Sequence, residues 1–339
     1  MRNEKKLGSA VIGLGVGVQH MLAILENSHC KLLRIVDIDK QKMEVVLNSH
    51  NLSKVKKSTY EDVLCDENIH LVSIASFDDD HYKQVMLALK AKKHVFVEKP
   101  MCRTVEELRE IHEAFTKSGC GVASNLVLRE APLYKHIKDL ILGGKFGQLY
   151  AFDGDYLYGR MHKITDGWRK DVNDYSVMQG GGIHMIDLMM WLTNEKPIYV
   201  VSSRNKIATK NSNFRYHDFH NAVFGFESGL VGRITANFGC VHPHQHVVRI
   251  FGTHATFIYD DQGARIHWNR EEENKPEILI KNPKPTSKGG LIHRFVDHIR
   301  NQDLQSSAER EFDLMSVVLA TDLSNEKQLN INYLSRKIS

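Results

Sequence analysis

The feature that most constrains the fold is an alternation of short apolar runs and helical segments over the first 120 residues. Apolar runs stand at 7–12, 32–36, 71–75 and 94–97, and each precedes a segment whose apolar residues have helical spacing. Strands and helices that alternate with short connections are typical of a parallel, doubly wound sheet. Ligands of such sheets bind outside the carboxyl ends of the strands, so candidate site residues are expected just after these runs.

A glycine cluster, GLGVG at 13–17, follows the first apolar run. Gly13 permits a tight turn, and Gly15 lets a pyrophosphate approach the backbone beside a helix N-terminus, whose free N–H groups attract anions. The third glycine of the usual G-x-G-x-x-G pattern is displaced, because Val18 stands at its place and Gly17 precedes it. An ordinary turn is the alternative, but the position between strand and helix favours dinucleotide binding.

Asp37 closes the second apolar run, about 20 residues past the glycines. A carboxylate at this place accepts hydrogen bonds from the adenosine ribose hydroxyls and repels a 2′-phosphate. No arginine stands beside Asp37, although Lys40 and Lys42 follow it. The sequence therefore predicts NAD rather than NADP, with a solvated turn aspartate as the alternative.

The pattern changes after residue 122. Residues 132–142 have the pattern of a helix that Gly143 and Gly144 end, and alternating apolar and polar runs follow between about 148 and 280. These runs predict a mostly antiparallel sheet of about six strands with one exposed face, which favours a homodimer or homotetramer through that sheet. Two further helices are expected near 288–301 and 308–325. We predict two domains, 1–123 and 124–339, in line with roughly 150 residues per domain.

Composition excludes several classes of protein. The net charge is +4 over 339 residues, with both signs interspersed, which is no footprint for nucleic acid or an anionic membrane. No segment reaches the roughly 20 apolar residues of a membrane span. The N-terminus lacks the features of a secretory signal, so a cytoplasmic location is expected. The five cysteines show no C-x-x-C spacing and are interpreted as buried free thiols.

Several motifs together resemble one known family. They are AVIGLG with a later histidine (residues 10–20), SIASFDDDH (73–81), KKHVFVEKPM (92–101), NLVLREAPLY (125–134), GGGIHMIDLMMWL (180–192) and FGTHATFIYDD (251–261). The chain is similar over nearly its whole length to the glucose-fructose oxidoreductase, inositol dehydrogenase and rhizopine-catabolism (Gfo/Idh/MocA) dehydrogenases. This resemblance implies an N-terminal Rossmann domain that binds NAD(P) and a C-terminal α+β domain with a large, mostly antiparallel open sheet. The second domain would bind substrate and form oligomers.

The resemblance also implies residue roles. Lys99 falls on the lysine that lies near the nicotinamide and the reacting hydroxyl, where a positioned acid/base group gives ~10²–10⁴-fold in rate. His184 falls on the histidine that contacts the substrate hydroxyl, and capping of a helix is its alternative role. The implied cofactor contacts are Gly13, Gly15, Gly17, Val18, Asp37, Ile38, Ala75, Ser76, His81, Glu98, Lys99 and Asn125.

The chain departs from the family pattern before His184. Many members carry an aspartate four residues before this histidine, and here that position is Gly180. Asp187 matches a different family aspartate, whereas Asp174 and Tyr175 are candidates to reach into the cleft instead. A polar and aromatic loop supplies further candidate substrate contacts, and its basic members hint at an anionic or nucleotide-linked substrate. These loop residues are Arg160, His162, Trp168, Arg169 and Lys170.

The run HPHQH at 242–246 raises the question of a metal site, since alternate residues of a strand share one face. Pro243 and the lack of a nearby carboxylate or thiolate count against a metal. Histidines on a strand face are the favoured interpretation, and no metal is expected.

We therefore expect an NAD(P)-dependent dehydrogenase acting on a secondary hydroxyl, or the corresponding ketone, of a sugar, inositol or amino-sugar derivative. A non-catalytic NAD-binding sensor and a redox-neutral NAD-dependent glycosidase are the alternatives. The expected partner is this small-molecule substrate.

Overall fold

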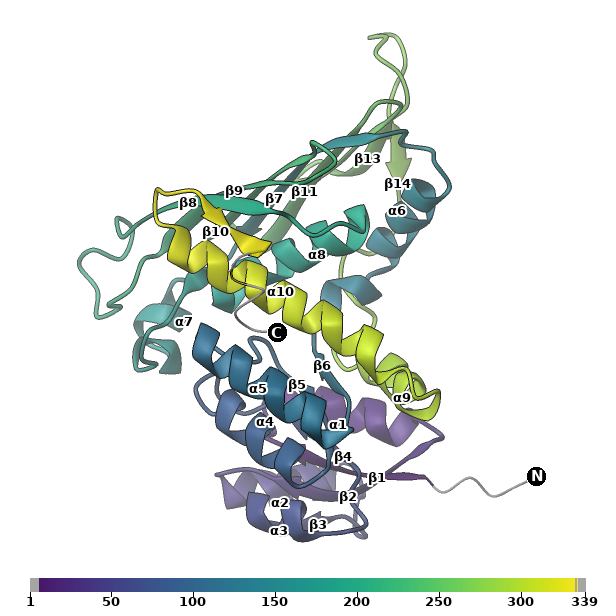
Figure 1. Ribbon diagram of the computed structural model, residues 1–339, viewed down its shortest axis with the longest axis vertical. Coiled ribbons are helices and arrows are strands. Elements are labelled where there is room, and N and C mark those ends of the chain that lie inside the picture. The colour runs from purple at the N-terminus through teal and green to yellow at the C-terminus, as the bar shows by residue number, and fades with distance from the viewer. Residues whose placement is uncertain (1–5, 333, 335–339) are drawn as a thin grey trace. The chain divides into compact units, whose positions relative to one another are not determined.

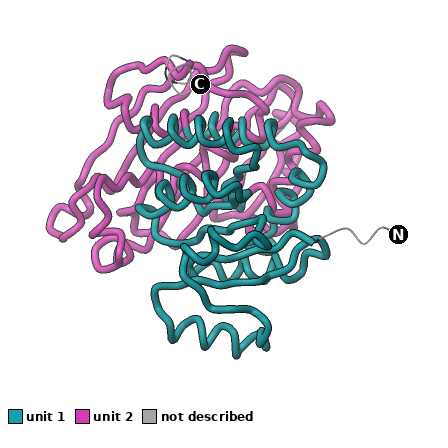
Figure 2. The backbone as a smooth tube through the Cα atoms, turned by 60° about the horizontal axis from the view of Figure 1, so that its bottom comes forward, with its two compact units in different colours: residues 1–127, 286–315, 338–339 teal, residues 128–285, 316–337 magenta. Residues whose placement is uncertain are grey.

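The computed structural model describes residues 6–332 and 334, which fall into two compact units (Figure 2). Among these residues, unit 1 contains the chain up to Val127 together with Thr286–Met315. Unit 2 contains Leu128–Pro285 and the residues from Ser316 onward. The division of the sequence into domains 1–123 and 124–339 stays a prediction.

Unit 1 is built on six parallel strands in the order β3-β2-β1-β4-β5-β6 (Figure 1). The strands are β1 (Leu7–Ile12), β2 (Cys30–Val36), β3 (Lys56–Lys57), β4 (Leu71–Ile74), β5 (His94–Val97) and β6 (Val122–Ser124). Its helices are α1 (Gly17–Glu26), α2 (Lys40–Ser49), α3 (Tyr60–Cys65), α4 (His81–Lys90), α5 (Val105–Ser118) and α9 (Leu291–Arg300). The predicted parallel, doubly wound sheet is thereby confirmed, and its strand order reverses between β1 and β4, the place where such sheets bind ligands.

Local sequence explains where the helices of unit 1 begin and end. At the start of α5, the Thr104 hydroxyl accepts from the Glu107 N–H at 3.1 Å, and the Glu107 carboxylate accepts from the Thr104 N–H at 3.3 Å. This is a capping box, which satisfies two N–H groups that a helix start leaves open. The helix ends at Gly119, whose φ of +68° is the left-handed conformation that favours glycine.

The segment Thr286–Met315 completes the core of unit 1. The Phe295 ring on α9 lies 6.0 Å from the ring of Phe96 on β5. A Cβ on Gly121 would come within 3.0 Å of the Phe295 ring, so only a residue without a side chain lets the ring pack this closely. Phe96 and Phe295 are both almost fully buried. A helix from the far end of the sequence therefore supplies part of the apolar face that covers the parallel sheet.

Unit 2 is built on a nine-stranded sheet in the order β14-β13-β12-β11-β7-β10-β9-β8-β15. Only the β7–β10 pair is parallel among the described strands of this sheet, so the predicted mostly antiparallel sheet is confirmed. The strands are β7 (Leu149–Leu157), β8 (Tyr199–Asn205), β9 (Phe219–Gly225), β10 (Val231–Asn237), β11 (Gln245–Gly252), β12 (Thr256–Asp260), β13 (Gly263–His267), β14 (Glu277–Leu279) and β15 (Leu329–Asn330).

The expected number of about six strands was wrong. Strands β7 to β12 correspond to the alternating runs in the sequence, whereas β13, β14 and β15 were not predicted, although the five residues of β13 do alternate in burial. Two of these are short, with three residues in β14 and two in β15. β15 pairs with β8 from a distant part of the chain, and no local pattern indicates such a pairing.

The helices of unit 2 lie along one face of its sheet, as α8 does in Figure 1. The helical elements are η1 (Val127–Glu130), α6 (Pro132–Leu142), α7 (His162–Thr165), η2 (Trp168–Lys170), the π-helix η3 (Met178–Gly182) and α8 (Ile183–Thr193). The helix α10 (Leu304–Ser324) begins in the residues of unit 1 and ends in those of unit 2. The helix predicted at 132–142 is confirmed, including its bounds.

The two faces of β7 differ in chemistry. Phe152 and Tyr156 are buried, and a Cβ on Gly154 between them would lie 3.3 Å from the Met185 side chain of α8. Asp153 and Asp155 alternate with them on the opposite face, where both form ion pairs with Arg233 of β10. One face of the sheet therefore packs on helices and the other is a charged surface. No described helix is long and apolar enough to cross a membrane.

Candidate active site

In unit 1, the glycine turn joins β1 to α1. Gly13 has φ +82°, and a side chain on it would collide with the Ala75 carbonyl at the end of β4. A Cβ on Gly15 would meet no atom within 4 Å, so this part of the backbone is open. The N-terminus of α1 has no side-chain cap and no acidic residue in its first turn. Open backbone and uncapped N–H groups at a helix start suit an anionic group such as a pyrophosphate.

Gly17 is the first residue of α1, so the displaced third glycine lies within the helix and not in the turn. A Cβ on Gly17 would lie 3.1 Å from the Ala75 Cβ and 3.2 Å from Val11, which is tighter than ordinary packing. Gly17 therefore lets α1 approach the sheet closely, which is the role usually given to the third glycine. Val18 follows within the helix and is half-buried.

Asp37 follows β2 and is held in place by its own surroundings. Its carboxylate accepts from the N–H of Leu14 at 2.6 Å and of Asp39 at 2.9 Å, and it pairs with Lys42 at 3.2 Å. Burial acts to raise the pKa of Asp37, but the hydrogen bonds from Asp39 and Leu14 and the charge of Lys42 lower it below its usual range. Ile38 beside it is 89% exposed, an apolar surface open to a ligand.

A polar network lies at the carboxyl ends of β4, β5 and β6. The Nδ2 of Asn125 donates to Glu98 Oε1 and to the Lys288 carbonyl, both at 2.7 Å. His20 lies between Ser73, 2.8 Å from its Nδ1, and Glu98, 3.1 Å from its Nε2. Because the Asn125 amide has two hydrogens for these two acceptors, the Nε2–H of His20 is left to donate to Glu98.

This network keeps Glu98 ionised. Burial acts to raise the pKa of Glu98, but the hydrogen bond and charge of His20, the charge of Lys99 and the Asn125 amide lower it to about 2. The Oδ1 of Asn125 is buried and accepts no hydrogen bond from any described residue. A buried acceptor without a donor indicates that a ligand donor belongs there. The carboxamide of a nicotinamide carries such a donor, so the residues present fit NAD.

Lys99 directly follows this carboxylate, and its peptide bond to Pro100 is cis. Lys99 is half-buried at the end of β5. The His81 ring binds the neighbouring loops, with Nδ1 2.7 Å from the Pro100 carbonyl and Nε2 3.3 Å from the Ser76 carbonyl. His81 therefore fixes the segments after β4 and β5, and its direct contact with a cofactor stays a prediction.

In unit 2, His184 lies in the first turn of α8, directly after the π-helical turn η3. Its imidazole stacks on Tyr156 of β7, with ring centroids 6.0 Å apart and an interplanar angle of 17°. One turn further along α8, Asp187 is 2% exposed and forms a bidentate ion pair with Arg129. The Arg129 Nε lies 2.9 Å from Asp187 Oδ1 and 3.0 Å from Asp187 Oδ2. Burial raises the pKa of Asp187, and Arg129 opposes this effect.

Tyr156 is the centre of an aromatic cluster that sequence reasoning missed. His246 stands opposite it in the β7–β11 register, and the rings of His246 and His244 lie 5.1 and 5.2 Å from its ring. Phe238 stacks on it at 5.7 Å. Burial lowers the pKa of His246 to about 3. The alternation of β7 predicts Tyr156 on the buried face, but its ring neighbours Phe238, His244 and His246 lie 82 to 90 residues away in the sequence.

The space beside Gly180 is occupied by Tyr175. A Cβ on residue 180 would collide with the Tyr175 hydroxyl. The Tyr175 ring is 6% exposed and packs against Phe214 at 5.8 Å and Tyr216 at 6.5 Å. Asp174 precedes it with φ +51°, and its N–H donates to the Tyr216 hydroxyl. The absence of a side chain at 180 is therefore matched by an aromatic residue that fills the place.

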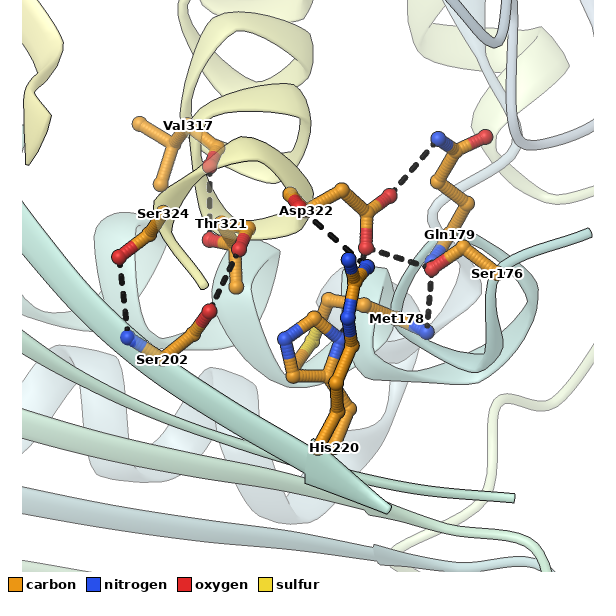
Figure 3. A network of polar contacts seen from close by, with 10 residues as sticks. Ser176, Met178, Gln179, Ser202, His220, Val317, Thr321, Asp322 and Ser324 are labelled. Carbon is orange, nitrogen blue, oxygen red and sulfur yellow. Dashed lines mark hydrogen bonds and ion pairs between the residues drawn. The ribbon is translucent and has the colours of Figure 1, made fainter. Parts of the chain in front are cut away.

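A further polar network anchors the π-helical turn (Figure 3). Asp322 on α10 accepts from the Ser176 hydroxyl at 2.7 Å and from Gln179 Nε2 at 2.8 Å, and His220 Nδ1 lies 3.5 Å from it. Burial raises the pKa of Asp322 to about 6 and lowers that of His220 to about 3. The segment that carries Gly180 and leads to His184 is thus fixed by buried polar contacts.

The other loop candidates lie between β7 and η3. The Arg160 guanidinium lies 5.7 Å from the Tyr158 ring centroid, and that of Arg169 lies 4.4 Å from the ring of Trp168 in η2. These residues are half-buried. Arg160 and Arg169 are close enough to Tyr156 for their charges to oppose the rise in its pKa that burial causes. The loop therefore brings cations to the aromatic cluster.

The HPHQH histidines are divided between two environments. His244 and His246 join the aromatic cluster, whereas His242 pairs with Asp261 at 3.1 Å on the surface. Within residues 6–332 and 334, no group of three His, Cys, Asp or Glu side chains is placed to hold a metal ion.

Two family models match this chain, and each match lies within the residues of one unit. The model described as "Oxidoreductase family, NAD-binding Rossmann fold" matches residues 7–126, and that of the GFO/IDH/MocA C-terminal domain matches residues 134–258. The chain belongs to the Gfo/Idh/MocA oxidoreductase family. The family resemblance predicted from the motifs is confirmed, and so is NAD as the cofactor of the Rossmann fold.

Curated relatives within the Gfo/Idh/MocA family are distant. An uncharacterized oxidoreductase, YrbE of Bacillus subtilis, is 26% identical over 76% of this chain and 74% of its own length. Inositol 2-dehydrogenase of Salmonella typhimurium is 26% identical over 56% of this chain and 55% of its own length. The 1,5-anhydro-D-fructose reductase of Ensifer adhaerens is 27% identical over 62% of this chain and 61% of its own length. The chain thus matches little more than half the length of the last two relatives.

Solved Gfo/Idh/MocA structures show the same fold over the whole chain. Levoglucosan dehydrogenase in complex with NADH has a TM-score of 0.82 at 18% identity, and covers 96% of this chain and 99% of its own. A putative NADPH-dependent oxidoreductase from Desulfitobacterium hafniense has a TM-score of 0.81 at 19% identity, and covers 99% of this chain and 100% of its own. At these identities the likeness establishes architecture and leaves the substrate to be argued from the residues.

Proposed function

We propose that this Gfo/Idh/MocA oxidoreductase is an NAD-dependent dehydrogenase that moves a hydride between nicotinamide and a secondary hydroxyl, or the corresponding ketone, of a sugar, inositol or amino-sugar derivative. The observation that carries the proposal is the network of His20, Glu98 and Asn125 beside Lys99. It fixes an ionised carboxylate next to a lysine at the ligand-binding end of the parallel sheet.

In this proposal the glycine turn binds the pyrophosphate and Asp37 binds the adenosine ribose. The remaining proposed cofactor contacts come from Val18, Ile38, Ala75, Ser76 and His81. The Oδ1 of Asn125 is a buried acceptor without a partner among the described residues, and it supports a carboxamide at this place. Bound NAD supplies the acceptor for the hydride that leaves the carbinol carbon.

Alcohol oxidation also requires the hydroxyl proton to leave, and we assign this step to Lys99. As the alcohol O–H bond breaks, its proton passes to the Lys99 side-chain nitrogen after that nitrogen has released its own third proton to solvent. Ketone reduction runs in reverse. His184 would hydrogen-bond the same hydroxyl and orient it, because Tyr156 fixes the plane of its ring. The substrate would be held further by residues of the loop between β7 and η3, namely Arg160, Trp168, Arg169, Asp174 and Tyr175.

The curated relatives support this class of substrate. The names of inositol 2-dehydrogenase and 1,5-anhydro-D-fructose reductase both denote oxidation or reduction of a polyhydroxylated ring. The proposal extends this chemistry to the present chain and leaves open whether its substrate is linked to a nucleotide.

The experiment is a turnover assay of the purified protein with NAD or NADP against sugars, inositols, sugar acids and nucleotide sugars. Reduction of NAD in step with ketone formation is the expected result. Turnover of a glycoside without net NADH would instead show a redox-neutral glycosidase. Tight NAD binding without turnover across the panel would show a sensor.

A further inference from the structure

The aromatic cluster of unit 2 lies where β7 ends and β11 begins. Tyr156 and Tyr158 point to the helix-covered face of the sheet, and His246 stands opposite Tyr156 in the register. The rings of Tyr158 and His244 lie 5.8 Å apart, and those of His244 and His246 lie 4.9 Å apart. His184, the proposed partner of the substrate hydroxyl, stacks on this cluster through Tyr156.

Two cations accompany these rings. The half-buried Arg160 has its guanidinium 5.7 Å from the Tyr158 ring centroid. Lys284 is an exposed lysine whose charge, like that of Arg160, acts to lower the pKa of His244 and His246. Within the described part of the chain, neither the Arg160 nor the Lys284 side chain forms an ion pair or a hydrogen bond. Arg160 and Lys284 therefore have no carboxylate counter-ion among the described residues.

The histidine beside these cations is neutral and incompletely bonded. Burial, with the charges of His244, Arg160 and Lys284, lowers the pKa of His246 to about 3. Its Nε2 is buried and has no hydrogen-bond partner among the described residues. A neutral imidazole offers one donor and one acceptor, which suits a hydroxyl group, whereas unpaired cations suit an anion.

We propose that Arg160 and Lys284 form an anion subsite beside His246, so that the substrate is a sugar that carries a carboxylate or a phosphate. This inference rests on the proposed function for the hydroxyl chemistry. The anion would be bound by the planar guanidinium of Arg160 and by the Lys284 ammonium, while the ring nitrogens of the cluster bind hydroxyl groups.

The alternative, a neutral polyol as substrate, fits the same hydroxyl partners but leaves both cations without a counter-charge. Charge-assisted hydrogen bonds are roughly twice as strong as neutral ones. An anionic sugar should therefore bind more tightly than its neutral counterpart, and the difference should depend on these two side chains.

The test is isothermal titration calorimetry of the full chain saturated with NADH, using glucuronate, glucose 6-phosphate and glucose as probes. We expect one of the two anionic probes to bind at least about tenfold more tightly than glucose. Which of the two binds distinguishes a carboxylate from a phosphate. Arg160→Gln and Lys284→Gln should each remove most of that difference in affinity between the anionic probe and glucose.

Matched controls come from exposed cations outside the cluster, Arg270→Gln and Lys281→Gln, which should leave all three affinities unchanged. Thermal melting verifies that each variant is folded. Equal binding of glucose and both anionic probes overturns the subsite, as do unchanged anion affinities in the two variants or no binding by either anionic probe. A protein that binds the anionic sugar but reduces no NAD would contradict the proposed function and leave the subsite supported.

Discussion

The hydroxyl of Tyr175 fills the space into which a side chain on residue 180 would project. Gly180 and Tyr175 are thus complementary in size, and both belong to the segment that Ser176 and Gln179 tie to Asp322. The difference from the D-x-x-x-H pattern of many family members is therefore accompanied by a second residue that adapts to it.

Restoring an aspartate at residue 180 should destabilise the protein. The new side chain would overlap the Tyr175 phenol, and overpacking of a buried site costs about 1–3 kcal/mol in free energy of unfolding. Urea denaturation of Gly180→Asp measures this loss. In a Tyr175→Ala background the same substitution should cost less, because the colliding ring is gone. Equal losses in both backgrounds would remove Tyr175 as the cause.

Lys99→Met should leave NAD binding within several-fold and lower turnover by at least about a hundredfold, because the methionine cannot accept the hydroxyl proton. Stopped-flow or steady-state kinetics at saturating NAD measures the loss. Lys83→Met, at an exposed lysine of α4, is the matched control and should keep wild-type turnover. Near-normal turnover of Lys99→Met would exclude Lys99 from the mechanism.

Cofactor choice should depend on Asp37 and Lys42. Asp37→Ala is expected to weaken NADH binding far more than NADPH binding, because the ribose acceptor is lost together with the charge that repels a 2′-phosphate. Lys42→Ala should instead weaken NADPH binding more than NADH binding. Lys42 lies 3.2 Å from the Asp37 carboxylate and partly neutralises the charge that repels a 2′-phosphate. Fluorescence titration with both cofactors measures the ratio.

Asp39→Ala is the control for these two variants. Asp39 caps α2 by accepting from the N–H groups of Gln41 and Lys42, so its loss lowers stability by about 1 kcal/mol without changing the ratio of NADH to NADPH affinity. If Asp37→Ala weakens both cofactors equally, the assignment of Asp37 to the ribose is wrong.

The stability of the protein should depend on Arg129 and Asp187 being present together. Removal of one partner leaves a buried charge without its counter-ion, which costs about 3–5 kcal/mol. Arg129→Met and Asp187→Asn are each expected to lose stability in this range, and the double variant should lose less than the sum. Chemical denaturation of the four proteins measures the coupling, and strictly additive losses would contradict it.

The raised pKa of Asp322 should be visible in how the free energy of unfolding changes with pH. Its pKa in the folded protein is raised to about 6 from an ordinary 3.8, so its contribution to stability is fully present below about pH 4 and is lost as pH rises through 6. The difference in free energy of unfolding between Asp322→Asn and wild type should therefore increase in favour of the variant by about 3 kcal/mol from pH 4 to 7.5.

His220 titrates in the same network but is unchanged in both proteins, so most of its effect cancels in this comparison. Asp166→Asn, at an exposed loop residue, is the control and should show no such trend. If the difference in free energy of unfolding stays constant between pH 4 and 7.5, the pKa of Asp322 is not raised in the folded protein.

Sequence patterns predicted the elements whose signals are local. The strands Leu7–Ile12 and His94–Val97 and the helix Pro132–Leu142 are all present as expected. Each depends on residues within about one or two turns of chain, where apolar periodicity and end-capping chemistry decide the conformation.

The parts that were missed depend on partners far apart in the sequence. Arg129 reaches Asp187 over 58 residues, Gln179 reaches Asp322 over 143, and β15 pairs with β8 over more than 100. Nothing in the local pattern around these residues indicates the partner. The π-helical turn before α8 was not predicted, because the packing of its glycines against Tyr175 and Met178 depends on the folded surroundings.

The return of residues 286–315 to the parallel sheet affects the order in which this protein can be made. Asn125 donates to the carbonyl of Lys288, and Phe295 closes over Phe96 and Gly121, so a ribosome that has released only the first 127 residues has delivered an unfinished nucleotide-binding half. That half must wait, with Phe96 uncovered, until strands β7 to β14 of the second sheet have been synthesised. A chaperone that shields apolar surface during elongation would have its main task in this interval.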